Sequence, residues 1–461
     1  MNKIFPATLL AGSGLAGPVW AQEAAAQIPD KGDTTWMMIS AILVMMMSVP
    51  GLALFYGGLV RARNMLSVLA QVFAVFCLMA VLWVAFGYSL AFTGAGSAAE
   101  AGPLTPYIGG LSKAFLAGVT PDAVAETFSK GVYIPEYTVV IFQMAFACLA
   151  PALIVGATAE RMKFSAILIF ATIWFVLSYL PMAHMVWWWG GPSAADAPAG
   201  LLFSHGALDF AGGTVIHINA GVAGLVAAIV AGPRLGFRKE LMAPHNLTFT
   251  FIGGCLLWIG WFGFNAGSNL EANGVAAMAI LNTVVATAAA GLAWALGEWI
   301  WRGHPSLLGA VSGAVSGLVG VTPAAGFVGP MGAIAIGIVS GLVCMGFVVG
   351  LKMKMRVDDS LDVFGIHGVG GIVGAVLTGV FAAPSLGGTG VWDYATDTVA
   401  PFDMGAQVYA QVLGVLICII WSAVVSFAAL HLIKAVIGLR VSHNDERQGL
   451  DITTHGENAY N

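Results

Sequence analysis

Eleven apolar stretches, each about 20 residues long, constrain the fold of this chain more than any other feature. An α-helix of that length crosses the hydrocarbon core of a bilayer. Charged residues make up only 9% of the chain, against roughly a quarter in an ordinary soluble domain. The sequence therefore predicts an all-α polytopic membrane protein surrounded by lipid. The stretches begin near Trp36, Met65, Val139, Ser165, Phe210, Thr248, Val275, Pro305, Phe327, Phe364 and Ala406.

Charge, cysteines and motifs exclude several functional classes. The 18 Lys and Arg residues against 23 Asp and Glu give a net charge of −5, so no basic surface for nucleic acid is expected. The cysteines stand singly, without CxxC pairs or histidines at ligand spacing, so we expect no disulfide framework, metal site or cofactor. The HExxH, GxSxG and Walker A patterns of common enzymes are also missing from the sequence. We therefore do not expect an enzyme.

The first residues have the pattern of a secretory signal peptide. Lys3 precedes a short apolar run, and small residues end the segment at Ala21. We expect residues 1–21 to be removed and residues 22–35 to form a periplasmic N-terminal segment. The alternative is a terminus that is not cleaved.

The distribution of basic residues gives the orientation, because Lys and Arg concentrate in cytoplasmic loops. When each loop is numbered by the stretch that it follows, fourteen basic residues fall in odd loops and only Lys113 and Lys130 in even ones. An error in the count of spans would scramble this alternation. We therefore expect a transmembrane domain over residues 36–435, with the mature N-terminus outside the cytoplasm and a cytoplasmic tail at 436–461.

Two histidines mark an internal repeat. His217 and His367 are each followed by Gly at +4, Gly at +7 and Val at +9, and Asp209 and Asp362 lie a little upstream. These segments are the fifth and tenth spans, so the repeat unit contains five spans, about 36–231 and 246–383. A unit with an odd number of spans enters the membrane from opposite sides in its two copies, which is an inverted repeat of the kind found in transporters. The last span, about 406–433, lies outside the repeat.

An ionisable side chain inside a span marks a transport pathway by default. His217 and His367 occupy matching repeat positions, so we expect them to meet near the membrane midplane. Two neighbouring imidazoles suit a neutral ligand or a relayed proton. A bare cation in hydrocarbon would cost of order 20 kcal/mol before relaxation. The alternative interpretation is a pair of structural histidines.

Aromatic residues supply a second sign. Tryptophans 187–189 end the fourth span, Phe142 and Phe146 lie in the third, and Trp261 and Phe264 lie in the sixth. Packing alone explains aromatic residues in many membrane proteins, but an outer aromatic face also holds a cation through cation–π attraction. Together with the histidines, these residues suggest a route that strips a proton from a cation and passes the neutral base. Asp209 either caps the fifth span or takes part in the proton chemistry.

Several motifs together resemble the ammonium transporter (Amt/Rh) family over nearly the whole mature chain. They are Asp209-Phe-Ala-Gly-Gly-Thr-Val-Ile-His-Ile-Asn-Ala220, Asp358-Asp359-Ser-Leu-Asp362-Val-Phe-Gly-Ile-His367-Gly, Ala53-Leu-Phe55-Tyr-Gly-Gly-Leu and Gly260-Trp-Phe-Gly-Phe-Asn-Ala-Gly-Ser268. The resemblance implies an eleven-span protomer, a homotrimer and one ammonium or ammonia pore through each protomer. Retention of the outer tryptophan favours the bacterial Amt branch.

The resemblance also implies roles for individual residues. Trp187 and Ser268 would recruit ammonium, with Phe146 beside them and a backbone carbonyl from Ala211. Trp188 is the alternative to Trp187. Phe146 and Phe264 would close the outer site, and His217 and His367 would line the pore. The vestibule positions are Phe142, Gln143, Trp261 and Phe55.

The tail from Gly438 to Tyr460 resembles the Amt tail that meets cytoplasmic PII signal proteins. The alternative for this segment is a solvated, disordered end. Two rival functions remain at this point. One is an ammonium sensor that signals through PII without transport, and the other is an Rh-like gas channel.

Overall fold

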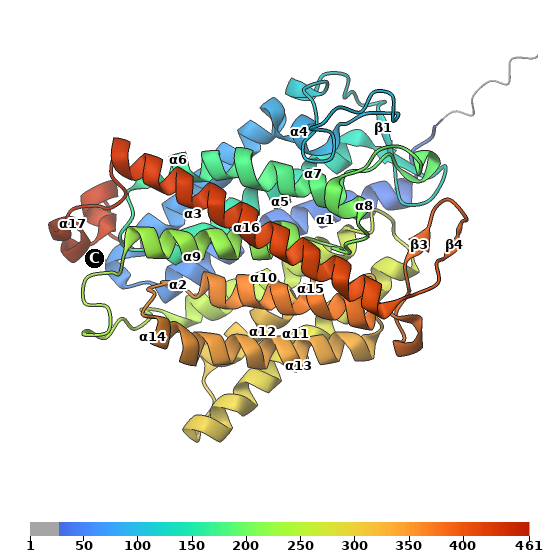
Figure 1. Cartoon of the computed structure of the whole chain (residues 1–461). Coiled ribbons are helices and arrows are strands. Elements are labelled where there is room, and N and C mark those ends of the chain that lie inside the picture. The colour runs from blue at the N-terminus through green and yellow to red at the C-terminus, as the bar shows by residue number, and fades with distance from the viewer. Residues whose placement is uncertain (1–26, 461) are drawn as a thin grey trace, which may run out of the picture.

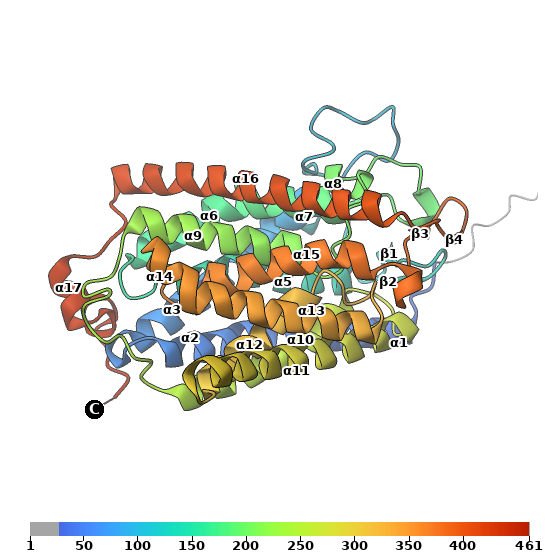
Figure 2. The ribbon, with the colours of Figure 1, turned by 60° about the horizontal axis from the view of Figure 1, so that its bottom comes forward.

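The computed structural model describes residues 27–460, so the expected signal peptide lies outside the described residues. Within them, ten helices are long and apolar enough to cross a membrane, and Leu307–Val321 is a shorter apolar helix. The expected all-α fold is confirmed, and the eleven expected spans correspond to these ten helices and the shorter one. Figures 1 and 2 show the helices lying side by side, with α17 at one end of the bundle and the short strands at the other.

The first five spans are built from the following elements, where η denotes a 3₁₀ or π turn. They are α1 (Lys31–Met46), η1 (Met47–Leu52) and α2 (Ala53–Leu59); η2 (Ala62–Asn64), α3 (Met65–Leu82), η3 (Trp83–Gly87) and α4 (Tyr88–Phe92); α5 (Glu136–Thr158); α6 (Phe164–Trp174), η5 (Phe175–Tyr179) and α7 (Leu180–Trp187); and η7 (Gly213–Ile218) with α9 (Asn219–Ala231).

The later spans are α10 (Leu247–Gly267), α11 (Gly274–Arg302), α12 (Leu307–Val321), α13 (Pro330–Met345) with η8 (Gly346–Leu351) and α14 (Lys352–Met355), η9 (Phe364–Gly368) with α15 (Val369–Phe381), and α16 (Met404–Val436). The loops at the end of the bundle opposite the tail contain η4 (Ala114–Leu116), the antiparallel pair β1 (Val124–Glu126) and β2 (Tyr133–Pro135), η6 (Pro192–Ala194), α8 (Leu201–Ser204), η10 (Pro384–Leu386), and the antiparallel pair β3 (Trp392–Asp393) and β4 (Thr398–Val399). The tail forms α17 (His443–Gln448) and η11 (Asp451–His455).

Polar residues just before the apolar stretches begin several of these helices. Each places a side-chain oxygen on a backbone N–H of the first turn, which would otherwise lack a partner in the membrane. The capping residues are Asp30, Asn246, Asn273, Ser306 and Asp403, for α1, α10, α11, α12 and α16 respectively.

The fifth and tenth spans cross in opposite directions at the centre of the bundle. The beginning of the fifth span, η7, packs on α15, and the beginning of the tenth, η9, packs on α9. A Cβ atom at Gly221 would overlap the backbone of Gly368, so only glycine permits this approach. The crossing is the arrangement that an inverted repeat requires.

The structure changes one detail of the repeat. Asp209 precedes His217 by eight residues, and the residue eight before His367 is Asp359 rather than Asp362. The Asp359 carboxylate caps the tenth span by accepting the N–H groups of Val363 (3.1 Å) and Phe364 (2.8 Å), whereas Asp362 pairs with Lys352. Burial and the nearby Asp362 raise the pKa of Asp359 to about 6.

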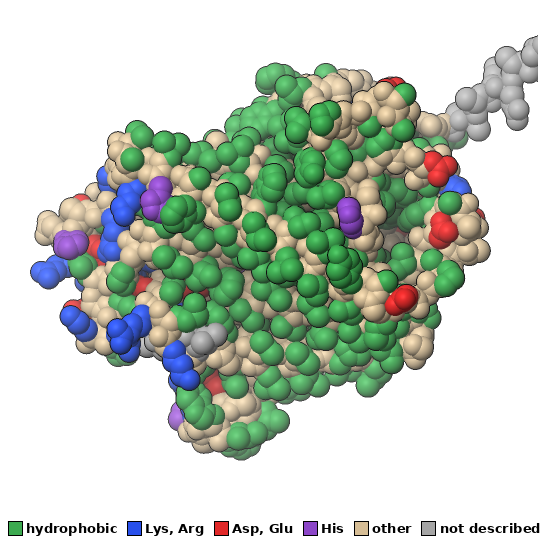
Figure 3. All heavy atoms as spheres, in the orientation of Figure 1, with side chains coloured by type: hydrophobic (Ala, Val, Ile, Leu, Met, Phe, Trp, Pro, Cys, Tyr) green, Lys and Arg blue, Asp and Glu red, His purple; other side chains and the backbone are tan. Residues whose placement is uncertain are grey.

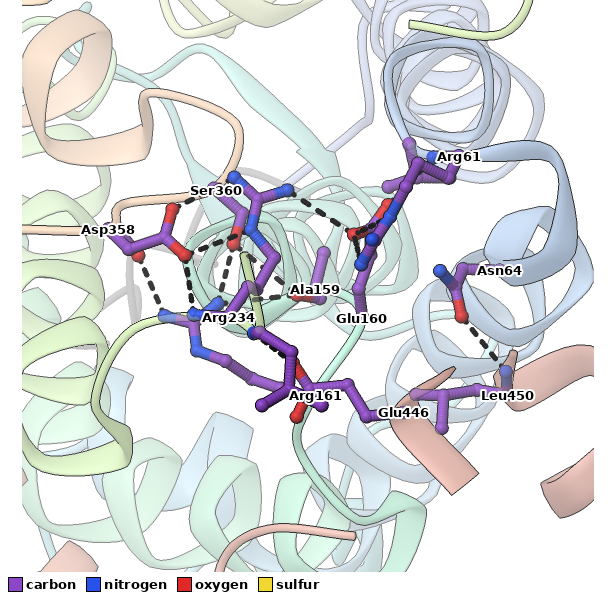
Figure 4. A network of polar contacts seen from close by, with 12 residues as sticks. Arg61, Asn64, Ala159, Glu160, Arg161, Arg234, Asp358, Ser360, Glu446 and Leu450 are labelled. Carbon is purple, nitrogen blue, oxygen red and sulfur yellow. Dashed lines mark hydrogen bonds and ion pairs between the residues drawn. The ribbon is translucent and has the colours of Figure 1, made fainter. Parts of the chain in front are cut away.

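Basic side chains gather at one end of the visible face, beside α17, and hydrophobic side chains cover its middle (Figure 3). At this basic end, Glu160 pairs with Arg61 (2.6 Å) and Arg234 (3.4 Å), and Arg234 also pairs with Asp358 (2.8 Å; Figure 4). Arg161 is fully buried, and burial lowers its pKa to about 10. These contacts join the loops that follow the first, third, fifth and ninth spans.

The tail docks on this same ion-pair network. Glu446 accepts the N–H of Leu235 (2.7 Å) and pairs with Arg440 (2.6 Å). Leu450 donates its N–H to Asn64 at 2.9 Å, as Figure 4 also shows. The tail is therefore an ordered part of the structure, and not the solvated end that composition alone allowed.

The network predicts a stability effect at Glu160. Glu160→Gln removes the negative charge between Arg61 and Arg234 while keeping the size of the side chain. We expect it to lower the free energy of unfolding by about 3 kcal/mol, because two nearly buried guanidinium groups lose their shared counter-charge. Thermal unfolding in detergent measures this. Glu240→Gln, at an exposed loop position at the same end of the bundle, is the matched control, and equal melting temperatures for the two variants would contradict the prediction.

Candidate functional site

The structure brings the two repeat histidines into direct contact. His217 and His367 are both buried, and their Nδ1 atoms lie 3.2 Å apart. Their rings are nearly parallel, with centroids 5.2 Å apart. A hydrogen bond between two Nδ1 atoms needs one donor and one acceptor, so at least one imidazole is neutral. The pair therefore carries at most one positive charge.

Trp261 packs against the ring of His217. Its indole stacks on the His217 ring at 5.3 Å, and its Nε1 donates a hydrogen bond to the Thr322 hydroxyl at 2.8 Å. Asn265 extends the chain of contacts, because its Oδ1 lies 3.2 Å from the same hydroxyl. No role for Thr322 was predicted. The one signal in the sequence is a hydroxyl residue at the end of an apolar stretch, since a polar group that is buried there needs a hydrogen-bond partner.

Stacked phenylalanines lie on the other side of His217. The rings of Phe146 and Phe264 are nearly parallel with centroids 4.3 Å apart, and Phe142 meets Phe146 edge-on at 4.7 Å. Phe264 also approaches His217, at 5.8 Å between ring centroids. All three phenylalanines are buried. Phe264 faces His217 and Phe146 faces Trp187, so the stack lies between the histidine pair and the end of the fourth span.

The three consecutive tryptophans have different environments. Trp187 meets Phe146 edge-on at 6.1 Å and donates its Nε1–H to the Asp209 carbonyl at 2.9 Å. Trp188 instead stacks on His184 at 4.6 Å and is buried. Of the two candidates for the outer site, Trp187 is therefore the one in contact with the stacked phenylalanines.

The predicted site also includes polar groups of the sixth and third spans. Ser268 ends α10 and donates its hydroxyl hydrogen to the Phe264 carbonyl at 2.9 Å, which leaves the hydroxyl oxygen able to accept. Gln143 Oε1 is buried and has no hydrogen-bond partner among the described residues. Ala211 is fully buried between Asp209 and the start of η7.

Asp209 organises the start of the fifth span. Its Oδ1 accepts the N–H groups of Gly212 and Gly213, and its Oδ2 those of Thr214 and Val215, at 2.6 to 3.0 Å. Burial raises the pKa of Asp209 above its ordinary value, although these four N–H groups oppose the shift. The geometry is that of a helix cap whose main chain also holds Trp187.

A small, narrow cavity is lined by the histidine pair. Its lining is apolar except for the imidazoles and the Trp261 indole, and it includes Phe55. The lining residues are Met47, Leu52, Phe55, Leu149, Leu153, His217, Leu257, Trp261, Val315 and His367. Within residues 27–460, no group of three or more His, Cys, Asp or Glu side chains is placed to hold a metal ion.

Comparisons with known proteins agree with this geometry. The sequence model of the Ammonium Transporter Family matches residues 35–460. An ammonium transporter of Bacillus subtilis (strain 168) is 45% identical over 434 residues, which cover 93% of this chain and 98% of the relative. Mep2 of Saccharomyces cerevisiae superposes with a TM-score of 0.76 at 32% identity, over 90% of this chain and 91% of Mep2. A sensor Amt protein superposes with a TM-score of 0.79 at 25% identity, over 92% of this chain and 98% of that one.

The cap geometry predicts local unfolding in Asp209→Asn. The amide has one acceptor oxygen, and its NH₂ group would face two backbone donors. We expect the amides of residues 212–215 to exchange hydrogen faster, on the order of tenfold, because a cap of this kind contributes about 1 kcal/mol or more. Hydrogen exchange followed by mass spectrometry measures this.

Asp403→Asn is the control for that experiment. Asp403 caps α16 through a single side-chain bond, to Ala406 N–H at 3.0 Å, in an exposed setting. Its effect should be smaller and confined to the start of α16. Unchanged exchange at residues 212–215 in Asp209→Asn would contradict the assigned cap.

Proposed function

This chain belongs to the ammonium transporter family and is a membrane transporter of ammonium; we propose that it recruits NH₄⁺ at an outer aromatic site and conducts ammonia past the twin histidines. The observation that carries this proposal is the contact between His217 and His367 in a narrow apolar cavity, with stacked phenylalanines between them and the outer end. Such a path accepts a small neutral base and rejects an ion.

The proposed outer site combines an aromatic ring with polar oxygens. The Trp187 indole offers cation–π attraction worth about 0.5 to 2 kcal/mol, and the Ser268 hydroxyl oxygen is free to accept an N–H of ammonium. Both residues reach the stacked phenylalanines, Trp187 through its ring and Ser268 through its hydrogen bond to Phe264. Ammonium bound here lies next to the Phe146–Phe264 stack, which closes the proposed path.

Deprotonation follows from the cost of moving a charge further inward. Bringing a bare ion into hydrocarbon costs of order 20 kcal/mol before relaxation, and beyond the Phe146–Phe264 stack the cavity offers no carboxylate. Ammonium therefore releases its proton before or at the stack, and ammonia crosses. Potassium is of similar size but has no proton to release, so it keeps the full cost of dehydration.

The histidine pair can assist ammonia without holding a second charge. One imidazole nitrogen in the shared Nδ1 contact donates and the other accepts, so the pair is already polarised within the pore. Trp261 restricts the His217 ring by stacking, and Thr322 restricts Trp261. This arrangement offers a passing ammonia molecule hydrogen-bonding partners at fixed positions.

We extend the proposal to the assembly and its surroundings. The family resemblance implies a homotrimer with one pore in each protomer. The basic end carrying the docked tail is proposed to be cytoplasmic in a bacterial inner membrane, which the gathering of Lys and Arg at that end supports. The tail is proposed to be the contact for a PII signal protein, because it is ordered and lies against three cytoplasmic loops.

A sensor that binds ammonium without transport is the second candidate. The similarity of the fold to that of a solved sensor Amt protein supports this candidate. An Rh-like gas channel is the third, and it would have no need of Trp187. Ammonium flux separates the sensor from the transporter, and the effect of Trp187→Leu separates the gas channel.

Variants at the histidines test the pore. His217→Ala and His367→Ala should each abolish methylammonium uptake or remove its selectivity against K⁺, because each leaves a void and an unpaired imidazole in the apolar cavity. Trp187→Leu should raise the KM for methylammonium, and His205→Ala, at an exposed outer position, should not. Uptake and K⁺ exclusion in proteoliposomes are the measurements. Wild-type uptake and selectivity in both pore-histidine variants would contradict the proposed pore.

Electrical recording tests the fate of the proton. If ammonia crosses while its proton stays outside, ammonium addition to proteoliposomes gives flux without current. A current proportional to flux would show that the proton also crosses by a relay. We expect any such current to disappear in His217→Ala, because the shared Nδ1 contact is the hydrogen-bonded link between the two repeats in the pore. A current that survives this substitution while the variant still excludes K⁺ would contradict a relay through the histidines.

A further inference from the structure

The hairpin formed by β1 and β2 touches both segments that carry the proposed outer site. It lies in the outer loop between the second and third spans, at the end of the bundle opposite the tail (Figures 1 and 2). Residue 135 ends β2 and Glu136 begins α5, the helix that carries Phe142 and Phe146. The hairpin is thus continuous with the third span, and its turn reaches the ends of the fourth and sixth.

One set of contacts joins the hairpin turn to the segment after Ser268. The Thr127 hydroxyl donates to Glu271 Oε1 at 2.6 Å, and the Ser129 hydroxyl donates to Glu271 Oε2 at 3.0 Å. Glu271 is only 7% exposed and also accepts from the Asn273 side chain at 3.0 Å. Both carboxylate oxygens are therefore occupied, and they hold the turn three residues after Ser268.

A second set of contacts joins the hairpin to the segment after Trp187. Glu126 accepts the backbone N–H of Ser193 at 3.2 Å and its hydroxyl at 2.5 Å. The Phe128 ring stacks on Trp189 at 6.3 Å. Trp189 in turn meets Tyr394, whose carbonyl accepts from Lys130 of the hairpin at 3.1 Å.

We infer that the β1–β2 hairpin is a brace that sets the separation of Trp187 and Ser268, with Glu271 as its positioning residue. This inference rests on the proposed function of those two residues as the outer ammonium site. A cation held between a ring and a hydroxyl gains little from either if their separation varies, because both attractions fall steeply with distance. The hairpin contacts hold the segments that follow the two residues, and neither contact touches the pore.

The brace makes a prediction that separates binding from transport. Thr127→Val keeps the shape of the side chain and removes the hydroxyl bonded to Glu271. The same hydroxyl also accepts the Ser129 N–H within the hairpin at 3.3 Å. We expect the KM for methylammonium to rise on the order of fivefold, because the bond to Glu271 and this support of the turn are lost together, while the maximal rate stays within twofold. Thr127→Ser keeps a hydroxyl and should restore the wild-type KM.

Thr105→Val is the matched control in the same outer loop. Among the described residues, the Thr105 hydroxyl has one hydrogen bond, accepted from the Gly102 N–H within the loop itself at 2.9 Å. We expect this variant to leave the KM unchanged. Ser193→Ala removes the hydroxyl contact on the Trp187 side, and the brace requires it to raise the KM as well.

Hydrogen exchange provides a readout independent of transport. In Thr127→Val, amides of residues 268–273 should exchange faster, and in Ser193→Ala those of residues 188–196 should do so. Unchanged KM and unchanged exchange in both variants would overturn the brace. A raised KM in Glu271→Gln with wild-type behaviour of Thr127→Val and Ser193→Ala would also overturn it, because Glu271 would then act through its charge alone.

The outcome can be assigned to the brace or to the outer site itself. If Trp187→Leu raises the KM and Thr127→Val does not, the brace fails while the proposed outer site stands. If Trp187→Leu leaves the KM unchanged, the proposed outer site fails, and any change in Thr127→Val is then a structural effect unrelated to recruitment.

Discussion

Hydrocarbon solvates neither charges nor unpaired polar groups, and the centre of this protein is arranged around that constraint. The polar groups at the start of the fifth span are paired closely, since the Asp209 carboxylate accepts four backbone N–H groups. His217 and His367 are paired with each other, with their Nδ1 atoms 3.2 Å apart. The remaining surroundings of the cavity are nearly all apolar. Under the proposed mechanism, a neutral solute meets little resistance in such surroundings, whereas an ion meets the full cost of losing its water.

The inverted repeat explains how one sequence pattern produces both ends of the path. A carboxylate eight residues before a histidine occurs twice, at Asp209 and at Asp359, and each carboxylate caps the helix that carries its histidine. Because the two helices cross in opposite directions, the caps face opposite ends while the histidines meet in the middle. The two copies differ in surroundings, since Asp209 accepts four N–H groups and Asp359 accepts two. Pseudosymmetry therefore sets the positions of these groups, and local contacts set their properties.

Polar contacts outside the bilayer hold the two ends of the bundle. At the basic end, Glu160 and Arg234 join loops from distant parts of the chain, and the tail docks beside them. At the opposite end, the β1–β2 hairpin joins the segments that follow the fourth and sixth spans. Ion pairs and hydrogen bonds can be used at these ends because water and headgroups lie nearby, whereas the apolar middle depends on close packing of small residues such as Gly221.

The sequence by itself determined the helical membrane fold, the span positions and the repeat. The length of an apolar stretch and the charges beside it decide whether that stretch lies in lipid or in water, and both are visible along the chain. It also pointed to His217 and His367, since an ionisable residue within an apolar span is rare. Only the tertiary structure decided that Trp187 rather than Trp188 meets the stacked phenylalanines, that Asp359 rather than Asp362 matches Asp209, and that Thr322 supports Trp261. Those outcomes depend on which way a side chain faces and on partners far away in the chain, and neither is encoded in the spacing of residues along one helix.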